Sequence, residues 1–387
     1  MQLLYGIFYL WGMVVRIVLS SPSALRGDKL TTTTTITTTT TTPEWYTDHG
    51  KIMLKERGTR EIALRGLTWP GLDTDALAPY GMWKHSQEFF LDQLRAQKFN
   101  AIRVLFSAEW AYYHWDATPN PSMIYNDIEA RNKTSLQILD MLMEKTQRKN
   151  IVIILAMGRL HKDFLTDIWV HYPEYPLSVF MESWFRLLDR YHLCPHLMGI
   201  DLFNEPHGVA TMSGDPEDPY DWITMIINTI EAIETRYPSN SWLYFVQGIP
   251  WGAGYNTTLV DTLLLKPYAN RIVYTPHIID RQDPDLYRVK TPVRKMFDTW
   301  DQEFGFVSDQ YHQKVMITRC NSVSTIWTGL LGDYALQNQM TNIFLWELST
   351  DPNEGIFQED WNNFRPDRIM ILEMIQPNVT HAILQNR

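Results

Sequence analysis

Short apolar runs alternate with amphipathic stretches along most of this chain, and this alternation restricts its fold more than any other feature. A run typical of a buried strand begins near each of eight positions: Leu64, Ala101, Ile151, Met198, Trp242, Arg271, Val315 and Asn342. The starts lie about 40 residues apart on average, the length of one strand, one helix and two loops. Eight such units predict an α/β fold, a (β/α)8 TIM barrel.

The stretches between the strands have the spacing of helices that cover a barrel. Residues 135–147 and 222–236 repeat apolar side chains every three or four positions. An open doubly wound sheet would alternate similarly, but no glycine-rich phosphate loop follows the first strand. Residues 51–66 indicate a short N-terminal hairpin that turns at Arg57-Gly58, and we expect it to plug the closed end of the barrel.

The first residues are typical of a targeting segment. Residues 3–15 are almost wholly apolar, and Arg16 and several small residues follow, which favours a cleaved secretory signal peptide. The alternative is an uncleaved signal anchor, because residues 3–19 reach the lower limit of a membrane span. We therefore expect a secreted, extracellular protein, attached to a membrane only if this segment is retained.

A threonine-rich tract separates this segment from the barrel. Eleven of the twelve residues from Thr31 to Thr42 are threonine, a composition that cannot bury a core and commonly carries O-linked sugar. Sequons fit a secreted glycoprotein and begin at Asn132, Asn256 and Asn378. The sequence thus divides into a signal peptide or anchor, a linker and a barrel domain, at residues 1–27, 28–45 and 46–387.

Charge and cysteine content exclude several classes of function. The 44 acidic and 34 basic side chains give a net charge of −10, which argues against nucleic acid as a partner. The two cysteines, Cys194 and Cys320, are too few for a disulfide framework, and we expect them to be unpaired. The histidines are scattered without metal-ligand spacing, so we expect neither a metal nor a cofactor. We also expect a monomer.

The end of the fourth predicted strand carries the strongest sign of chemistry. In a barrel of this type the active site gathers where the strands end and the following loops begin. Residues 198–203 form the predicted strand, and Asn204-Glu205-Pro206-His207 follows, so that a carboxylate and an amide lie at the mouth. Glu205 is therefore the first candidate for a catalytic acid or base.

Motifs at six strands together resemble glycoside hydrolase family 5, the cellulase-like retaining glycosidases, over roughly residues 51–361. They are Gly66-Leu67-Thr68-Trp69, Asn100-Ala101-Ile102-Arg103, the run from Gly199 to His207, Phe245-Val246-Gln247-Gly248, Tyr274-Thr275-Pro276-His277, and Trp346 with Gly355-Ile356-Phe357 and Asp360-Trp361 downstream. Each match alone is weak, but their order along the chain is specific.

The resemblance implies roles for individual residues. It makes Glu205 the acid/base and Asn204 the residue that holds a sugar hydroxyl. It places Arg103, His277 and Trp346 around the subsite that distorts the reacting sugar. Trp69, near the end of the first strand, is expected to offer a ring on which a sugar can stack.

The seventh strand departs from the family. Retaining hydrolysis needs two carboxylates about 5 Å apart. The family supplies the second one in Ile-Gly-Glu-Phe-Gly, but this chain reads Ile317-Thr318-Arg319-Cys320, with Arg319 in the nucleophile's place. An arginine stays protonated and cannot attack, and its charge disfavours an oxocarbenium-like transition state. It should also lower the pKa of Glu205 and make it a poor acid.

Smaller departures occur at other strand ends. Gly158 stands where these enzymes usually carry a histidine, Ile278 follows His277 where a tyrosine is common, and Gln247 replaces a frequent glutamate. Glu303-Phe304-Gly305 imitates the missing motif, but we expect it in the helix before the seventh strand. Strand alternation should point Glu347 away from the side that Trp346 faces.

Three hypotheses follow. The first is a secreted, cellulase-like protein that binds β-linked glucan or a related polysaccharide with retaining hydrolysis lost or much reduced. The second is an active, endoglucanase-like glycosidase that pairs Glu205 with an unidentified carboxylate, for which Glu109, Asp116 and Asp163 are within reach in sequence. The third is a non-catalytic interaction or decoy protein that keeps only the scaffold.

Overall fold

The computed structural model describes residues 5–10, 13–18, 43–171, 173–279, 293–321 and 325–384. The chain forms two compact units, Met1–Thr42 and Pro43–Arg387. In the first unit β1 (Tyr5–Leu10) pairs with β2 (Met13–Val18) in an antiparallel arrangement. The predicted threonine-rich linker lies almost entirely outside the described residues. Among the described helices, none is long and apolar enough to cross a membrane.

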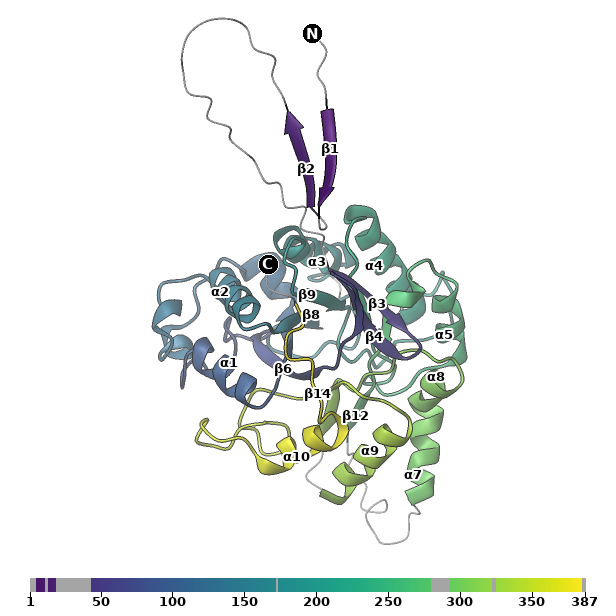
Figure 1. Ribbon diagram of the computed structural model, residues 1–387. Helices are drawn as coiled ribbons and strands as arrows, with labels where there is room; N and C mark the ends of the chain where they lie inside the picture. Colours follow the sequence, from purple (N-terminus) through teal and green to yellow (C-terminus); the bar gives the residue numbers. More distant parts are fainter. Residues whose placement is uncertain are drawn as a thin grey trace, which may run out of the picture. The chain divides into compact units, whose positions relative to one another are not determined.

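The second unit is built on parallel strands (Figure 1). Seven of them pair in the order β11-β10-β9-β8-β7-β6-β14. Their bounds are β6 (Arg65–Leu72), β7 (Ala101–Ser107), β8 (Val152–Arg159), β9 (Leu197–Asp201), β10 (Leu243–Val246), β11 (Ile272–Tyr274) and β14 (Ile343–Leu345).

Residues 315–321 complete the ring as the seventh barrel strand in sequence. Val315 bridges to Tyr274 of β11, and Ile317 bridges to Ile343 of β14, so that the open edges of the sheet are joined. Farther along, β13 (Arg319–Asn321) pairs with β12 (His277–Ile279), with Arg319 beside His277. The prediction of a (β/α)8 barrel is confirmed.

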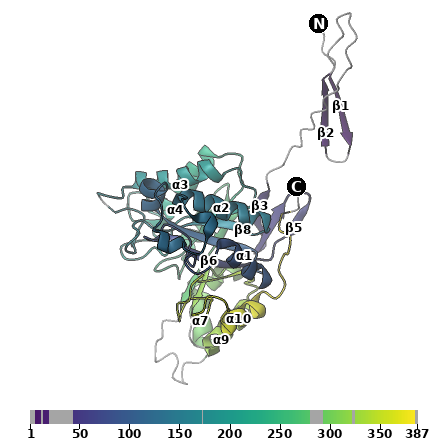
Figure 2. The ribbon, with the colours of Figure 1, turned by 90° about the vertical axis from the view of Figure 1, so that its left-hand side faces the viewer.

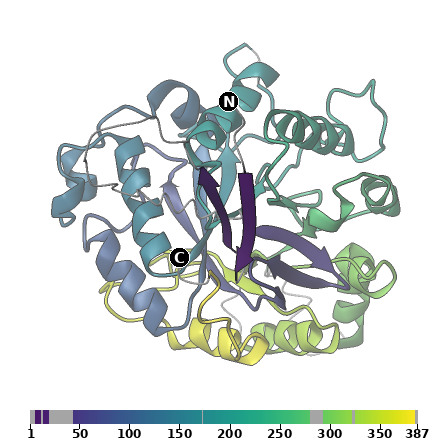
Figure 3. The ribbon, with the colours of Figure 1, turned by 45° about the horizontal axis from the view of Figure 1, so that its top comes forward.

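Helices surround the strands (Figure 3). They are α1 (Gln87–Ala96), α2 (Ser135–Arg148), α3 (Leu177–Tyr191), α4 (Trp222–Arg236), α5 (Thr257–Leu264), α7 (Val293–Trp300), α8 (Phe306–Asp309), α9 (Thr325–Gln337) and α10 (Pro366–Ile375). Short helical turns join them: η1 (Trp110–His114), η2 (Pro121–Ile124), η3 (Ile128–Ala130), η4 (Ala269–Arg271) and η5 (Asp301–Gly305). Local signals start several helices: Thr134 and Gln137 form a capping box on α2, and Asp221 caps α4. Near the C-terminal end α9 and α10 lie side by side (Figure 2).

Along each strand, successive side chains point alternately into the barrel interior and toward the surrounding helices. The interior floor is apolar and packs in one cluster with the N-terminal hairpin: Ala101, Val152, Ile154, Met198, Leu243, Phe245, Val273, Met316 and Phe344. Gly66 and Gly199 leave room there, because a Cβ would overlap the ring of Phe344 or the carbonyl of Leu243. Only glycine fits at these two positions, because the neighbouring strands fill the space that a side chain would need.

The N-terminal hairpin closes the floor of the barrel. It consists of β3 (Glu44–Asp48), β4 (Lys51–Lys55) and β5 (Thr59–Glu61), paired antiparallel. Trp45, Ile52 and Leu54 are fully buried in the same cluster as the barrel floor. The predicted plug is confirmed, with one more strand than we expected.

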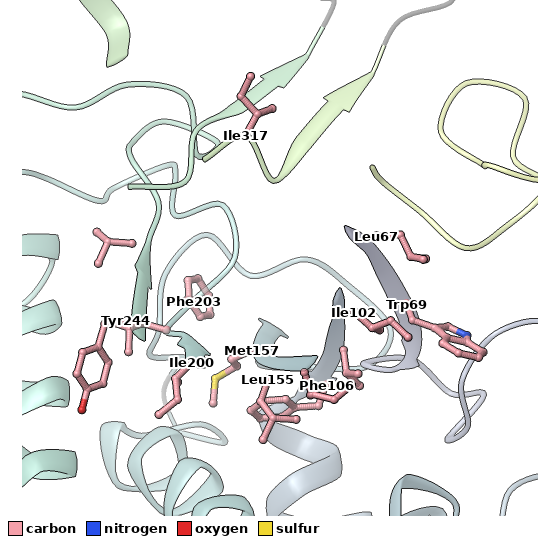
Figure 4. Packing of buried hydrophobic residues seen from close by; sticks show 14 of the residues in the cluster. Leu67, Trp69, Ile102, Phe106, Leu155, Met157, Ile200, Phe203, Tyr244 and Ile317 are labelled. Atoms are coloured by element: carbon pink, nitrogen blue, oxygen red, sulfur yellow. The ribbon is translucent and has the colours of Figure 1, made fainter. Parts of the chain in front are cut away.

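The outward side chains form a second, larger core under the helices (Figure 4). Trp69 belongs to it, since Thr68 takes the inward position on β6. Its ring is 1% exposed, packs edge-on against Phe90, and its Nε1 donates to the carbonyl of Tyr80. The expectation that Trp69 stacks on a sugar is therefore wrong, because strand parity directs the ring into the core. Cys320 is also buried in this core, and both cysteines are unpaired as predicted.

Candidate active site

A layer of polar side chains lies above the apolar floor and supports the mouth of the barrel. Arg103, on β7, is 0% exposed and donates from Nε to Asp201 at 2.7 Å and from Nη2 to the Asn204 amide oxygen at 2.9 Å. Gln247, also 0% exposed, donates to Asp201 at 3.2 Å and to Asn204 at 3.3 Å. These hydrogen bonds link the four side chains, so Arg103 positions Asn204 from below and is itself covered.

Glu205 follows Asn204 with a constrained backbone. Its φ is 56°, in the left-handed region that glutamate rarely adopts. Its amide donates to Oε1 of Gln247 at 2.7 Å, a hydrogen bond that holds this conformation. The turn directs a carboxylate that is only 5% exposed into the mouth.

Two side chains from the opposite wall contact this carboxylate. His277 Nδ1 lies 2.7 Å from Oε1 of Glu205, and Arg319 Nη1 lies 2.5 Å from the same oxygen. The register of β12 and β13 places His277 and Arg319 next to each other, which explains the shared acceptor. The structure thus brings together six of the seven residues that the sequence indicated, all except Trp69: Arg103, Asn204, Glu205, His277, Arg319 and Trp346.

Arg319 is held from three directions. Its Nη2 donates to Oε1 of Glu354, which lies in the loop after β14. Its guanidinium lies 4.5 Å from the centroid of the Trp346 ring, a cation–π distance. Trp346 is 8% exposed in this arrangement, and the ring of His277 meets it edge-on at 5.9 Å. One face of the indole is therefore occupied by the protein's own cation.

These contacts decide the charge of the groups at the mouth. Burial alone would raise the pKa of Glu205, but the hydrogen bond from His277 and the charge of Arg319 outweigh it and lower the pKa to about 2. Burial lowers the pKa of His277, which leaves the ring neutral with Nδ1–H toward the carboxylate. Glu205 is ionised at neutral pH and carries no proton for a leaving group.

A second carboxylate lies close to Glu205. One guanidinium bridges Glu205 and Glu354, and its terminal nitrogens are fixed in a rigid fork, so the two bound oxygens are no more than roughly 7 Å apart. Retaining glycosidases hold their carboxyl groups at about 5 to 5.5 Å and inverting ones at about 6.5 to 9.5 Å. Sequence reasoning missed Glu354, because a loop residue nine positions beyond the end of a strand gives no periodic signal.

Glu347 is the next carboxylate along this wall. Strand alternation does not apply to it, because β14 ends at Leu345. Burial, with the negative charges of Glu354 and Asp73, raises the pKa of Glu347 to about 7. Close to neutral pH this group is therefore only partly ionised.

The space beside Gly158, one of the predicted departures from the family, holds the side chain of Asp73. An added Cβ on Gly158 would lie 3.3 Å from the Cβ of Asp73, which comes from the loop after β6. Asp73 is 1% exposed and lies 3.1 Å from Nη2 of Arg159. A side chain at position 158 would press its Cβ against Asp73, which would have to shift slightly to make room.

The other carboxylates considered from the sequence have different partners. Glu109 accepts from the amide of Lys162 at 2.9 Å and lies 3.6 Å from Nε2 of His161. Asp163 is half exposed and pairs with the side chain of Lys162. Glu303 lies in η5, as predicted, and not at the end of the seventh strand. None of the described His, Cys, Asp and Glu side chains forms a group of three or more that could hold a metal ion.

An aromatic pair, His207 and the exposed Trp251, lies beside the turn that carries Glu205. Trp251 is 41% exposed, and its ring stacks on His207 with centroids 3.4 Å apart and planes 15° apart. The Trp251 amide donates to the carbonyl of Pro206, and His207 Nδ1 lies 2.7 Å from the carbonyl of Glu205. The mouth therefore presents one open aromatic surface beside its acidic residue.

A (β/α)8 barrel whose strand ends gather a carboxylate, a histidine and an indole has the architecture on which many barrel enzymes place their active site. The chain matches the family model described as Cellulase (glycosyl hydrolase family 5) over residues 57–283, more than half of its length, and it belongs to this family. It is thus a cellulase-like glycoside hydrolase homologue, as the motifs predicted.

Several proteins with similar sequences or folds are endoglucanases or endocellulases. The chain is 27% identical over 364 residues to an endoglucanase of Paenibacillus polymyxa, covering 87% of this chain and 89% of that one. It is 23% identical to the major extracellular endoglucanase of Xanthomonas campestris, covering 85% and 71%. A hyperthermophilic endocellulase of Pyrococcus horikoshii has the same fold, with a TM-score of 0.77 at 23% identity over 88% of this chain and 100% of that chain.

The lowered pKa of Glu205 predicts a pH dependence of stability. An ionised group whose pKa falls from 4.5 when unfolded to about 2 when folded stabilises the fold above pH 4.5, by roughly 3 kcal/mol. This contribution is lost as the pH falls from 4.5 toward 2. In urea unfolding, the stability difference between the wild type and Glu205→Gln should be largest at pH 6 and shrink by pH 2.5. A stability difference that does not change with pH would contradict the lowered pKa of Glu205.

Proposed function

We propose that this protein binds β-linked glucan or a related polysaccharide, and that retaining hydrolysis is lost or much reduced because Arg319 replaces the nucleophile. The observation that carries the proposal is the guanidinium between Glu205 and Glu354, over the face of Trp346. A cation at this point opposes oxocarbenium character in the sugar and keeps Glu205 ionised. The protein therefore lacks both the protonated acid and the attacking carboxylate that retaining hydrolysis requires.

Glucan as the ligand is supported by relatives and by the rim of the barrel. A variant of the Pyrococcus horikoshii endocellulase, which shares this fold, has been solved in complex with cellotetraose. In this chain Trp251 supplies an exposed ring beside Glu205, and flat aromatic rings suit the apolar faces of sugars.

We further propose that the protein is secreted, which the apolar residues 3–15 and the threonine tract support.

Hydrolysis assays test the loss of activity directly. Wild type and Glu205→Gln are incubated with aryl β-cellobiosides and soluble β-glucans, and released product is measured. We expect no turnover that distinguishes the two proteins. Turnover in the wild type that disappears in Glu205→Gln would overturn the proposal.

That outcome would instead favour a second candidate, an active endoglucanase-like glycosidase. The observation in its favour is that one guanidinium bridges Glu205 and Glu354, so that this barrel holds two carboxylates close together at its mouth, as glycosidases do. Such an enzyme would lose its turnover in Glu354→Gln as well. A barrel that neither binds nor cleaves glycans would support the remaining alternative, an interaction or decoy protein.

Trp251 gives a specific prediction for binding. Trp251→Ala should weaken the affinity for cellohexaose about five- to tenfold, since a stacked aromatic contact contributes on the order of 1 kcal/mol. Titration calorimetry measures the change. Tyr46→Ala is the matched control, because this partly exposed ring lies on β3 of the hairpin at the closed end of the barrel, away from the mouth. Equal affinities for the wild type and Trp251→Ala would show that the sugar does not use this surface.

A further inference from the structure

Glu354 lies in a loop that is closely fixed by its own hydrogen bonds. Oδ1 of Asp351 accepts from the amides of Asn353 and Glu354 at 2.8 and 3.0 Å. The carbonyl of Glu354 accepts from the amide of Glu347 at 2.8 Å, which ties the loop to the end of β14. A Cβ on Gly355 would overlap the carbonyl of Ser349, so the turn is tight. The carboxylate therefore projects from a preorganised backbone.

Arg319 receives its orientation from two carboxylates acting on opposite ends of one guanidinium. Nη1 binds Glu205 and Nη2 binds Glu354, and charge-assisted bonds of this kind are the strongest that side chains form. With both ends held, the planar group stays over the Trp346 ring and is itself 13% exposed. A contact to Glu205 alone would leave the guanidinium free to rotate about that bond.

No other described group near Arg319 duplicates the contribution of Glu354. Glu347 interacts with Arg319 through its charge, but burial and the neighbouring carboxylates keep it largely protonated below pH 7. Arg103 and His277 also face Arg319, and Arg103 adds a like charge while His277 is neutral. Loss of Glu354 should therefore leave the cation with one full counter-charge instead of two.

We propose that Glu354 is a positioning residue that holds Arg319 across the face of Trp346, so that the Arg319–Glu354 pair closes the innermost sugar position of the barrel. A glycan that reaches Glu205 must first displace this pair, whereas a glycan on Trp251 need not. The inference rests on the proposed function for the nature of the ligand. The closure itself is a property of the protein alone and can be measured without any glycan.

The first experiment observes the Arg319 guanidinium by nitrogen NMR of the full chain, with the signals assigned through Arg319→Lys. In the wild type we expect separate Nη1 and Nη2 signals, because rotation must break both carboxylate contacts. In Glu354→Gln these signals should merge, and Glu354→Asp should restore slow exchange at least in part. Unchanged Arg319 signals in Glu354→Gln would overturn the proposal.

The second experiment measures cellohexaose affinity at pH 6. If the closed pair competes with sugar, the apparent affinity scales with the open fraction, and Glu354→Gln should bind about tenfold more tightly than the wild type. Arg319→Ala should bind at least as tightly, and Glu354→Asp should stay within about threefold of the wild type. Glu347→Gln is the matched control and should change little, since Glu347 is largely protonated at this pH.

The two readouts separate the possible failures. Glu354→Gln that binds cellohexaose no more tightly than the wild type would overturn the closure at the sugar position. Failure of every variant to bind would contradict the proposed function, and the NMR comparison would then still decide whether Glu354 positions Arg319.

Discussion

Arg319→Glu is expected to give this barrel measurable hydrolysis of aryl β-cellobiosides with retention of configuration. The substitution removes the cation from the Trp346 face and supplies a carboxylate from the same backbone position, opposite Glu205. We expect a rate roughly 100-fold above the background measured for Arg319→Gln, the lower end of what a positioned general acid contributes, the role that Glu205 takes in this variant. Release of nitrophenol and the anomer first formed, observed by proton NMR, are the measurements.

The same change should convert Glu205 into an acid. In the wild type, contacts from His277 and Arg319 lower its pKa to about 2. With a glutamate at position 319, Glu205, Glu354 and the new carboxylate would lie close together, and like charges at such distances raise one of the pKa values strongly. The hydrolysis rate of this variant should accordingly fall with rising pH, with a midpoint near or above pH 5, as the acid loses its proton.

Two controls isolate the chemistry. Arg319→Gln removes the charge without adding a nucleophile and should stay inactive. Adding Glu205→Gln to Arg319→Glu should abolish the regained rate. If Arg319→Glu is no faster than Arg319→Gln, the changes at Gly158 and Ile278 have also dismantled the site.

Asp201→Ala should destabilise the barrel by about 3–5 kcal/mol. Asp201 is 1% exposed and accepts from Nε of Arg103, which is 0% exposed, at 2.7 Å. Removing one member of a buried pair leaves the other charge without compensation in a medium of low polarity. Nη1 of Arg103 already makes no hydrogen bond among the described residues, so the guanidinium has little alternative stabilisation.

Urea unfolding at pH 7 measures this effect, with Asp189→Ala as the control. Asp189 also pairs with an arginine, Arg236, but both side chains are about half exposed, and such pairs contribute at most about 1 kcal/mol. If Asp201→Ala lowers the free energy of unfolding by less than about 1 kcal/mol, water or a shift of the surrounding structure must stabilise the charge of Arg103.

Strand parity explains most of what the sequence predicted correctly and the one site residue that it placed wrongly. Arg103, His277, Arg319 and Trp346 were located from motifs, and each takes an inward position. The same parity places Trp69 outward, next to Thr68 facing in, which the motif alone did not reveal. Gln247 was noticed only as a departure from the family, yet its side chain supports both Asn204 and the backbone of Glu205.

The amino-acid sequence by itself determined the barrel, its hairpin plug, the family and the presence of Arg319 at the end of the seventh strand, because period, spacing and motif order are local properties of the chain. The sequence also placed Arg319 near Glu205, but only the tertiary structure showed that Glu354 binds the same guanidinium. Glu354 reaches Arg319 from a loop without any periodic pattern, and Asp73 fills the space beside Gly158 from the loop after β6. Such contacts depend on where distant segments meet, and this is fixed only when the ring of strands closes.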